Sequence, residues 1–307
     1  MAACLVCGNT MTPRWRVRDH SRPDDDAEYE MAWCRNCAYG RVAGGFRPEE
    51  VSAFYQHAYY THTASDAESE KPKALPSRLR MHLAWRVDRG VDLSPREVQP
   101  ISEHPRLCDV GCGNGIAMRR FQATGYAVTG IEPDPAARAV AESIGPVYGG
   151  TAEALPDEVA GQRFDVVLLS HVLEHCIDPV AALGNVKGLL APGGTAIIEV
   201  PNNAAVALDT FGPAWFFADI PRHLHFFTER SLSQVMEHAG LRTVRAFHTG
   251  YTRQFSPGWL AKQQLIAETV GGADTGEARQ WGLLARTAFA APARKYDSIR
   301  LHAVAAD

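Results

Sequence analysis

Continuous apolar runs alternate with amphipathic segments through the middle of the chain. Short apolar runs are typical of strands buried on both faces of a parallel sheet. Such runs occupy 107–110, 126–131, 147–149, 164–170 and 195–200, and two further strands are expected at 242–247 and 298–304. Helices are expected at 116–123, 134–143 and 179–190, with Asp134 and Pro179 at helix starts, where these residue types are favoured. Alternating strands and helices predict an α/β fold with a ligand at the carboxyl ends of its strands.

A glycine-rich stretch follows the first of these runs. Leu107–Gly115 reads Leu-Cys-Asp-Val-Gly-Cys-Gly-Asn-Gly, so glycines recur at every second position after Asp109. Glycine tolerates positive φ and has no Cβ, so the backbone can approach a bound molecule closely. A helix beginning after this turn directs free N–H groups at that molecule. The second run ends in Glu132, a carboxylate able to accept both hydroxyls of a ribose. Dinucleotide enzymes use a similar turn, so the turn alone does not identify the ligand.

Five segments together resemble the motifs of class I S-adenosylmethionine-dependent methyltransferases. In chain order they are 109–115, Glu132, 151–156, 164–171 and 190–194, within a resemblance that covers about 105–250. The resemblance implies a Rossmann-like seven-stranded sheet, parallel with an antiparallel last strand, and S-adenosylmethionine as cofactor. The residues that it places around the cofactor are Asp109, Gly111, Cys112, Gly113, Gly115, Glu132, Pro133, Ala152, Glu153, Ser170 and His171.

Four of the seven cysteines form two pairs near the N-terminus, Cys4-x-x-Cys7 and Cys34-x-x-Cys37. Two such pairs predict a tetrahedral thiolate site for a structural Zn²⁺, in a zinc-ribbon module with strands at 14–17 and 29–33. Gly8 and Gly40 are expected in the turns after the pairs. A module of this size buries too little apolar surface to fold alone, so the metal would supply folding energy. A redox dithiol is the alternative, but it needs only one pair. The other three cysteines are expected to be small buried residues.

The sequence predicts three consecutive parts: a zinc-ribbon module at 1–47, a linker and helical cap at 48–104, and the methyltransferase domain at 105–307. Tyr55, Tyr59 and Tyr60 resemble lid tyrosines of related enzymes with N-terminal extensions, although aromatic packing explains them equally well. A helix is expected at 77–91. Its apolar face, formed by Leu79, Leu83 and Val87, would cover the sheet before the first strand.

The end of the fourth predicted strand supplies the first group of candidate acceptor-site residues, His171-Val172-Leu173-Glu174-His175. His171 and His175 are candidate catalytic residues, because they follow the strand at the sheet's carboxyl edge. The spacing resembles, with one change, the Glu-x-x-Glu-His of ubiquinone-pathway O-methyltransferases, whose side chains can hold a divalent metal; here the first carboxylate is a histidine. An inverted zinc-protease motif also has this spacing but requires a long helix. The alternative for His175 is a helix-entry residue bonded to the backbone.

The connection after strand five supplies the second group. It is rich in aromatic residues, which suit an apolar or flat acceptor: Phe211, Trp215, Phe216 and Phe217. His223 and His225 follow and titrate near neutral pH. His223 is the preferred general base for an acceptor hydroxyl, since the family has a similar Pro-Arg-His-Leu-x-Phe-Phe string; a structural role is the alternative. A helical insertion at 256–296 is expected to be a pocket roof or a dimer surface.

The net charge and the distribution of apolar residues disfavour further classes of function. In 307 residues the net charge is −4, which disfavours a nucleic-acid surface. No apolar run is long enough to span a membrane, and no signal peptide is apparent, so a cytoplasmic protein is expected. The expected activity is methyl transfer to a small-molecule sugar, lipid-linked or secondary-metabolite acceptor, in a possible homodimer. Similar zinc-ribbon fusions include deoxysugar C-methyltransferases, whose large C-terminal domain has no counterpart here. The alternatives are a zinc-module rRNA methyltransferase and a non-catalytic partner that binds S-adenosylmethionine.

Overall fold

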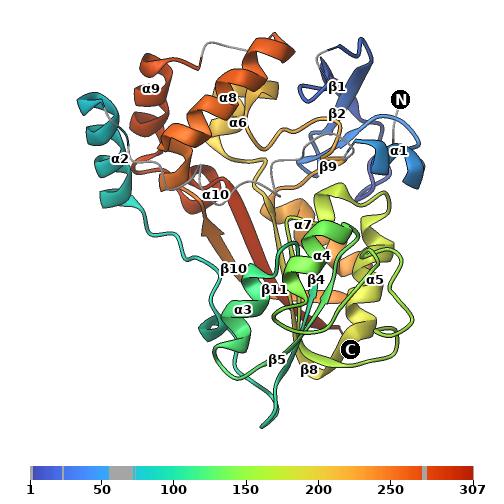
Figure 1. The fold of residues 1–307 in the computed structure, drawn as a ribbon. Coiled ribbons are helices and arrows are strands. Elements are labelled where there is room, and N and C mark those ends of the chain that lie inside the picture. The colour runs from blue at the N-terminus through green and yellow to red at the C-terminus, as the bar shows by residue number, and fades with distance from the viewer. Residues whose placement is uncertain (1–2, 23, 55–71, 73, 272–274, 307) are drawn as a thin grey trace. The chain divides into compact units, whose positions relative to one another are not determined.

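The computed structural model describes residues 3–22, 24–54, 72, 74–271 and 275–306, and the chain forms two compact units (Figure 1). Unit 1 comprises Met1–Val91, Pro201–Ser231 and His248–Ile299. Unit 2 comprises Asp92–Val200, Leu232–Phe247 and Arg300–Asp307. Both units therefore combine segments that are distant in sequence, whereas the three parts expected from the sequence are consecutive.

Most of a seven-stranded sheet belongs to unit 2, in the order β10-β11-β8-β7-β4-β5-β6. The strands are β4 (Arg106–Val110), β5 (Ala127–Ile131), β6 (Val147–Tyr148), β7 (Phe164–Ser170), β8 (Leu190–Pro201), β10 (Leu241–Thr249) and β11 (Ser298–Ala305). Parallel ladders join β4 to β5 and β7, β5 to β6, and β7 to β8. The last strand in sequence lies between β8 and β10. The expected Rossmann-like fold class is confirmed.

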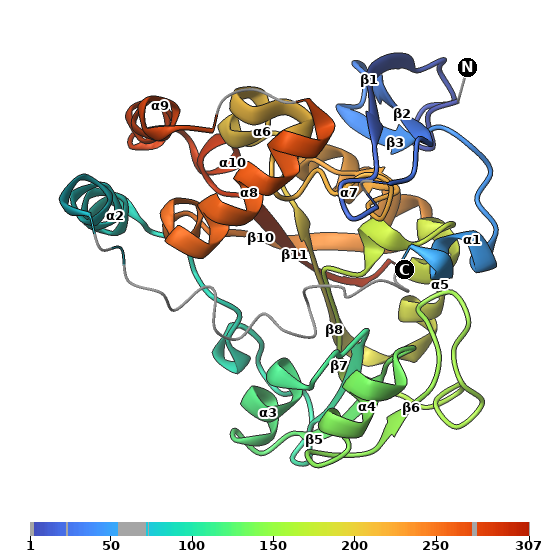
Figure 2. The same cartoon turned by 45° about the horizontal axis from the view of Figure 1, so that its top comes forward.

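Three helices of unit 2 lie where the sequence predicts them: α3 (Ile116–Gln122), α4 (Pro135–Ala141) and α5 (Pro179–Leu189). A fourth helix, α7 (Glu229–His238), was not predicted, and its first three residues belong to unit 1. α3 packs on β4 and β5, α4 on β6, and α5 on β7 (Figure 2). Asp134 accepts a hydrogen bond from the backbone N–H of Ala136 and begins α4 as expected. The 190–194 segment, expected as a turn, is part of β8; its ladder with β7 shifts register between Phe164 and Val166, which accommodates Gly193 at φ +80°.

A smaller antiparallel sheet in unit 1 contains the predicted ribbon strands. Its order is β1 (Thr12–Arg18), β2 (Glu28–Cys34), β3 (Tyr39–Val42) and β9 (His225–Phe226). β9 comes from the connection after strand five and pairs with Gly40 and Arg41 of β3. The prediction that Gly40 serves a turn is wrong. Gly40 lies within β3, where an added Cβ would come within 2.6 Å of Met31 and 2.8 Å of Trp33. Close packing of the strands therefore requires glycine at this position.

The other elements of unit 1 are short helices around an aromatic core. They are α1 (Pro48–Ala53), α2 (Leu75–Val87), α6 (Val206–Phe211), α8 (Pro257–Val270), α9 (Glu277–Thr287) and α10 (Pro292–Lys295), with 3-10 turns η4 (Gly212–Ala214) and η5 (Thr252–Phe255). Both helices expected in the 256–296 insertion are present as α8 and α9. Trp215, Phe216 and Phe217 are buried among Tyr251, Phe255 and Trp259. These aromatic residues, expected to form an acceptor wall, pack in a hydrophobic core with the insertion.

The predicted apolar face of α2 is only partly buried. Leu79 is 50% exposed and Leu83 39% exposed, whereas Val87 packs against the aromatic core of unit 1. Arg80 and Ala84, which were not predicted on this face, are buried. Arg80 is buried because Glu277 of α9 accepts a hydrogen bond from it at 2.5 Å and the Trp281 ring lies 5.9 Å from its guanidinium. Within unit 1, α2 packs against η5 and α9. The proposed lid tyrosines, Tyr55, Tyr59 and Tyr60, lie outside the described residues.

Candidate functional site

Three glycines shape the turn after β4, each for a different physical reason. Gly111, Gly113 and Gly115 all have positive φ, at +76°, +53° and +80°. A Cβ on Gly111 would lie 2.3 Å from Val172, and one on Gly115 would lie 2.6 Å from Ile144. A Cβ on Gly113 would meet no atom within 4 Å. The first and third glycines therefore allow close packing within the protein, whereas the second borders open space where a ligand can approach the backbone.

Glu132 fixes this turn from the end of the neighbouring strand. One carboxylate oxygen accepts the Gly113 N–H at 2.8 Å and the other accepts the Asp134 N–H at 2.9 Å. Each carboxylate oxygen has two lone pairs, so both can accept a further hydrogen bond from a ligand hydroxyl. The carboxylate thus links the glycine turn to the start of α4 and keeps acceptor capacity beside the open space at Gly113.

Asp109 and Cys112 lie buried on either side of the strand end. Burial, reinforced by the negative charge of Glu132, raises the pKa of Asp109 to about 7. Burial likewise raises the pKa of Cys112 well above its usual value, so its thiol is protonated and offers no reactive thiolate. Cys112 packs among the apolar residues of the unit 2 core. Its contribution to the turn is the backbone, which donates from N–H to the Ile131 carbonyl at 3.1 Å.

The 151–154 segment is tied to the beginning of α5. The Glu153 carboxylate accepts the Asp178 N–H at 2.7 Å. The Asn185 amide of α5 donates to the carbonyls of Ala152 and Glu153 at 2.9 and 3.2 Å. Ala152 is buried, and Pro133, after Glu132, is exposed. Asn185 positions two of the expected cofactor residues, but no sequence motif identified it, because a lone asparagine in a helix has many possible roles.

His171 lies at the end of β7, partly exposed, between two buried carboxylates. Its two ring nitrogens lie 3.3 Å from Glu174 and 3.5 Å from Glu199, and its backbone adopts φ +56°. Burial alone would lower the pKa of His171, but the two carboxylates raise it to about 9. The imidazole is therefore a cation at neutral pH and is suited to stabilise negative charge. Ser170, which precedes it, pairs with Glu199 in the sheet.

From His171, a chain of charges continues across the sheet through residues that the sequence analysis did not identify. Arg300 of β11 donates to Glu199 at 2.5 Å and to both oxygens of Glu97 at 2.8 and 3.0 Å. Burial would raise the pKa of Glu199, but His171 and Arg300 lower it to about 2. Glu199 is therefore ionised at neutral pH and anchors His171. Its partners are distant in sequence, so only the sheet order reveals the network.

His223 and His225 are both buried but differ in the nitrogen that carries the proton. His223 Nδ1 lies 2.9 Å from the Phe217 carbonyl, which only accepts, so Nδ1 carries the hydrogen and Nε2 of the neutral ring is basic. His225 Nδ1 contacts the Tyr39 hydroxyl. Burial raises the pKa of Tyr39, so that hydroxyl is protonated and donates, which leaves the hydrogen of neutral His225 on Nε2. Of the two, His223 has the tautomer required of a base at Nε2.

Buried ion pairs hold the segment that carries His223. Arg222 donates to Asp219 through Nε at 2.8 Å and Nη2 at 2.5 Å, and to Asp19 through Nη1 at 2.8 Å. His20 contacts the same Asp219 oxygen at 2.9 Å. Burial would raise the pKa of Asp219, but Arg222 and His20 hold it well below its usual range. The segment that carries His223 is therefore attached to Asp19, just after β1, and to β3 through the pairing of β9.

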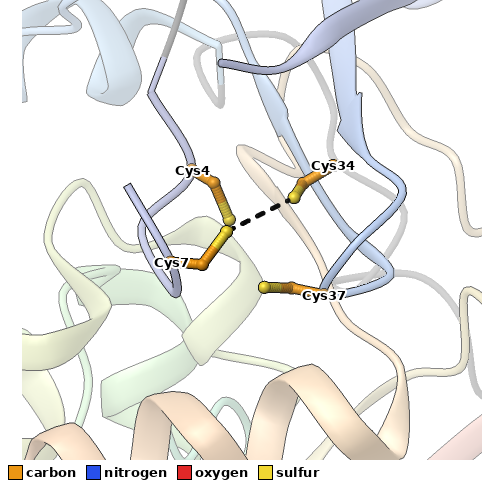
Figure 3. A group of neighbouring side chains, drawn as sticks. All are labelled: Cys4, Cys7, Cys34 and Cys37. Atoms are coloured by element: carbon orange, nitrogen blue, oxygen red, sulfur yellow. Dashed lines mark hydrogen bonds between the residues drawn. The ribbon is translucent and has the colours of Figure 1, made fainter. Parts of the chain in front are cut away.

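The four N-terminal cysteines converge in unit 1 (Figure 3). Their sulfur atoms all lie within 4.8 Å of one another, and Cys7 Sγ is 3.7 Å from Cys34 Sγ. That separation is too long for a disulfide, and it matches the distance between two thiolates bound 2.3 Å from one tetrahedral metal. Backbone and side-chain N–H groups approach the sulfurs, from Val6 to Cys4 and from Asn36 to Cys37. The arrangement fits a closed four-thiolate metal site.

Comparisons with known proteins identify the family to which this chain belongs. A family model described as "Methyltransferase domain" matches residues 79–246. A ubiquinone biosynthesis O-methyltransferase from Methylobacterium nodulans is 35% identical over 171 residues, which cover 52% of this chain and 68% of that protein. A protein of the same name from Cereibacter sphaeroides is 36% identical over 152 residues, which cover 45% of this chain and 61% of that protein, under two thirds of its length.

Solved structures are more distant. The Burkholderia thailandensis 1,6-didemethyltoxoflavin-N1-methyltransferase, solved with 1,6-didemethyltoxoflavin and S-adenosylhomocysteine bound, is 16% identical to this chain. It aligns with a TM-score of 0.47, over 96% of this chain and 100% of that one. The [4+2]-cyclase SpnF aligns with a TM-score of 0.48 at 18% identity, over 78% of this chain and 86% of that one.

Proposed function

Because this chain belongs to the family of S-adenosylmethionine-dependent methyltransferases, we propose that it moves the cofactor's methyl group to a small-molecule acceptor. The observation that carries the proposal is the turn at Gly113, which is open on one side and held by the carboxylate of Glu132 on the other. This corner offers a stretch of backbone that a ligand can approach closely and a carboxylate that can accept further hydrogen bonds, two features that a nucleoside bearing hydroxyl groups requires.

The cofactor residues have separate roles in this proposal. Glu132 accepts from the ribose hydroxyls, and the turn at 111–115 presents its backbone to the amino-acid end. Ala152 and Glu153, held by Asn185, border the adenine. Asp109 supports the turn from beneath, and Cys112 and Pro133 contribute backbone shape. When bound, S-adenosylmethionine supplies an electrophilic methyl group on a sulfonium, so the protein's task is to align an acceptor with it and exclude water.

A hydroxyl acceptor must lose a proton as it attacks. We propose His223 as the residue that accepts this proton at Nε2, supported by the Nδ1 contact with the Phe217 carbonyl. His171 is a cation held by two carboxylates and would stabilise negative charge on the acceptor. His175 is a second candidate from the same segment. A His223→Gln variant keeps a donor for the carbonyl but has no base, so kcat should fall about a hundredfold with cofactor affinity unchanged.

The cysteine cluster is proposed to hold one structural Zn²⁺. Cys4, Cys7, Cys34 and Cys37 would each supply a thiolate, which leaves no open position for a substrate. The metal would join the N-terminal loop to the end of β2. Its chemistry is therefore confined to folding, and no catalytic step is assigned to it.

A small molecule is favoured over nucleic acid as the acceptor because the chain is acidic overall, with a net charge of −4. Among the described residues no helix has the length and apolar character needed to cross a bilayer. The cytoplasmic location and the homodimer expected from the sequence stay predictions.

A methyl-transfer assay tests the proposal directly. Tritiated S-adenosylmethionine would be incubated with the protein and separate pools of sugars, phenols and RNA. Transfer to a small molecule but not to RNA is expected. Transfer to RNA alone would support the rRNA methyltransferase alternative, and cofactor binding without transfer to any pool would support a non-catalytic partner.

A further inference from the structure

Unit 1 contains a pocket that the proposed methyl transfer does not use. It has a volume of about 400 Å³, within the range of small-molecule sites. Residues from the ribbon strands and from the segments after strand five line it, all in unit 1: Thr12, Pro13, Arg14, Trp33, Arg35, Ala38, Asn203, Ala204, Asp209, Thr228 and Arg294.

Cations outnumber anions in this lining. Arg14, Arg35 and Arg294 face a single carboxylate, Asp209, so the lining carries an excess of two positive charges. Asp209 lies 2.6 Å from Arg294 and 3.7 Å from Arg14. The Arg14 guanidinium lies over the Trp15 and Trp33 rings at 4.5 and 4.9 Å, which restricts its motion. Arg35 is exposed at the pocket and forms no ion pair among the described residues. Arg14 and Arg294 are therefore held in position before an anion binds, and Arg35 can contact the anion without breaking an ion pair.

The charge excess and the volume of the pocket indicate what kind of ligand fits it. The arginines need an anion, and the excess of two charges matches a phosphate dianion better than a carboxylate. Inorganic phosphate alone would fill only part of about 400 Å³, so the ligand must carry a further group, and hydroxyls on that group suit a lining that includes Thr12 and Thr228. We propose that this pocket binds a small phosphate monoester whose remainder carries hydroxyl groups, such as a sugar phosphate. The site is distinct from the cofactor corner and does not depend on methyl transfer.

Titration calorimetry on the whole chain as purified, at low salt, tests the proposal. The probes are glucose 1-phosphate, ribose 5-phosphate and glycerol 3-phosphate, with glucose and inorganic phosphate as controls. At least one phosphate ester should bind, glucose should not, and inorganic phosphate should bind at least tenfold more weakly than the best ester. If none of the three esters binds, or if inorganic phosphate binds as tightly as they do, the proposal is overturned.

Charge removal within the pocket supplies the second test. Arg35→Gln removes the exposed arginine, and Arg16→Gln removes an exposed arginine of β1 that is not part of the lining. The Arg35 variant should bind the ester about tenfold more weakly, with the control unchanged. Equal affinity in both variants would contradict the assignment. Affinity for S-adenosylhomocysteine, measured on the same samples, reports separately on the proposed methyltransferase function.

Discussion

At the scale of single residues, the cofactor corner separates glycines needed for folding from one needed for ligand access. Gly111 and Gly115 have no room for a Cβ, whereas Gly113 faces open space. All three have positive φ, so an alanine at any of them carries a backbone penalty of about 1–2 kcal/mol. Only the steric surroundings differ, and these decide whether a substitution damages the fold or the ligand site.

Alanine substitutions should reveal this difference. Gly111→Ala forces a contact with Val172 and should lower the free energy of unfolding by several kcal/mol. Gly113→Ala should lower it by only about 1–2 kcal/mol but weaken S-adenosylhomocysteine binding at least tenfold, because the methyl group projects into the space left for the ligand. Urea unfolding and calorimetry measure the two effects. Equal loss of stability in both variants would contradict this interpretation.

Asp109 makes stability depend on pH in an unusual direction. Burial and Glu132 raise its pKa to about 7, above the value near 4 of an unfolded aspartate. Between about pH 4 and 7 the folded protein holds a proton that the unfolded chain releases, so this residue's contribution to stability declines as pH rises and is constant above about 7. At 1.36 kcal/mol per pKa unit, the total change is at most about 4 kcal/mol.

An Asp109→Asn variant should remove this dependence. The free energy of unfolding of the variant minus that of the unmodified protein should be larger at pH 8 than at pH 5, as measured by urea titration. Asp157→Asn, at an exposed aspartate, serves as the control and should show no such difference. A variant that loses equal stability at both pH values would show that Asp109 is ionised in the folded protein throughout.

At the scale of elements, β9 links the ribbon sheet to the segment that contains His223. Val42 donates from its N–H to the Leu224 carbonyl at 2.9 Å, and Ser231 and Thr228 donate to the Ala38 carbonyl. The ribbon therefore supports the segment after strand five in addition to its own cysteines. Disruption of the metal site is expected to destabilise both the ribbon sheet and the segment after strand five.

The cysteine site predicts a specific metal content. Purified protein should contain one zinc per chain, and Cys37→Ser should lower this well below one equivalent, whereas Cys112→Ser, at a buried cysteine outside the cluster, should leave it unchanged. Elemental analysis measures the content. Full zinc in the Cys37 variant, or none in the unmodified protein, would contradict a four-thiolate zinc site.

Sequence reasoning succeeded where a pattern is local and failed where it depends on distant partners. The strands of the seven-stranded sheet were predictable because burial on both faces demands apolar runs such as Phe164–Ser170. The cysteine pairs were predictable from spacing. β9 was missed because two residues carry no strand signal without β3 beside them. The buried face of α2 was missed because Arg80 reads as a surface residue until Glu277 is known. Arg300 and Asn185 were missed for the same reason.

At the scale of the whole molecule, the cofactor motifs and the cysteine cluster fall in different compact units. The glycine turn, Glu132 and the 151–154 segment belong to unit 2, and the cysteines and β9 belong to unit 1. Each ligand should stabilise the unit that binds it, by an amount set by its concentration relative to its dissociation constant.

Hydrogen exchange can resolve the two units. S-adenosylhomocysteine should slow exchange at 109–115, 131–134 and 151–155. A zinc chelator should speed exchange at 10–42 and 224–227. Chelation that deprotects the cofactor segments as strongly as the ribbon strands would show that the two units unfold together.

The carboxylate of Glu132, together with the turn at Gly113, is proposed to bind the cofactor. Calorimetric titration of S-adenosylmethionine into the unmodified protein and into Glu132→Ala is the most direct measurement. The unmodified protein should bind S-adenosylmethionine. The variant should bind it at least a hundredfold more weakly and keep the circular dichroism spectrum of the folded protein. An unchanged dissociation constant in Glu132→Ala would show that the Glu132 carboxylate does not bind the cofactor.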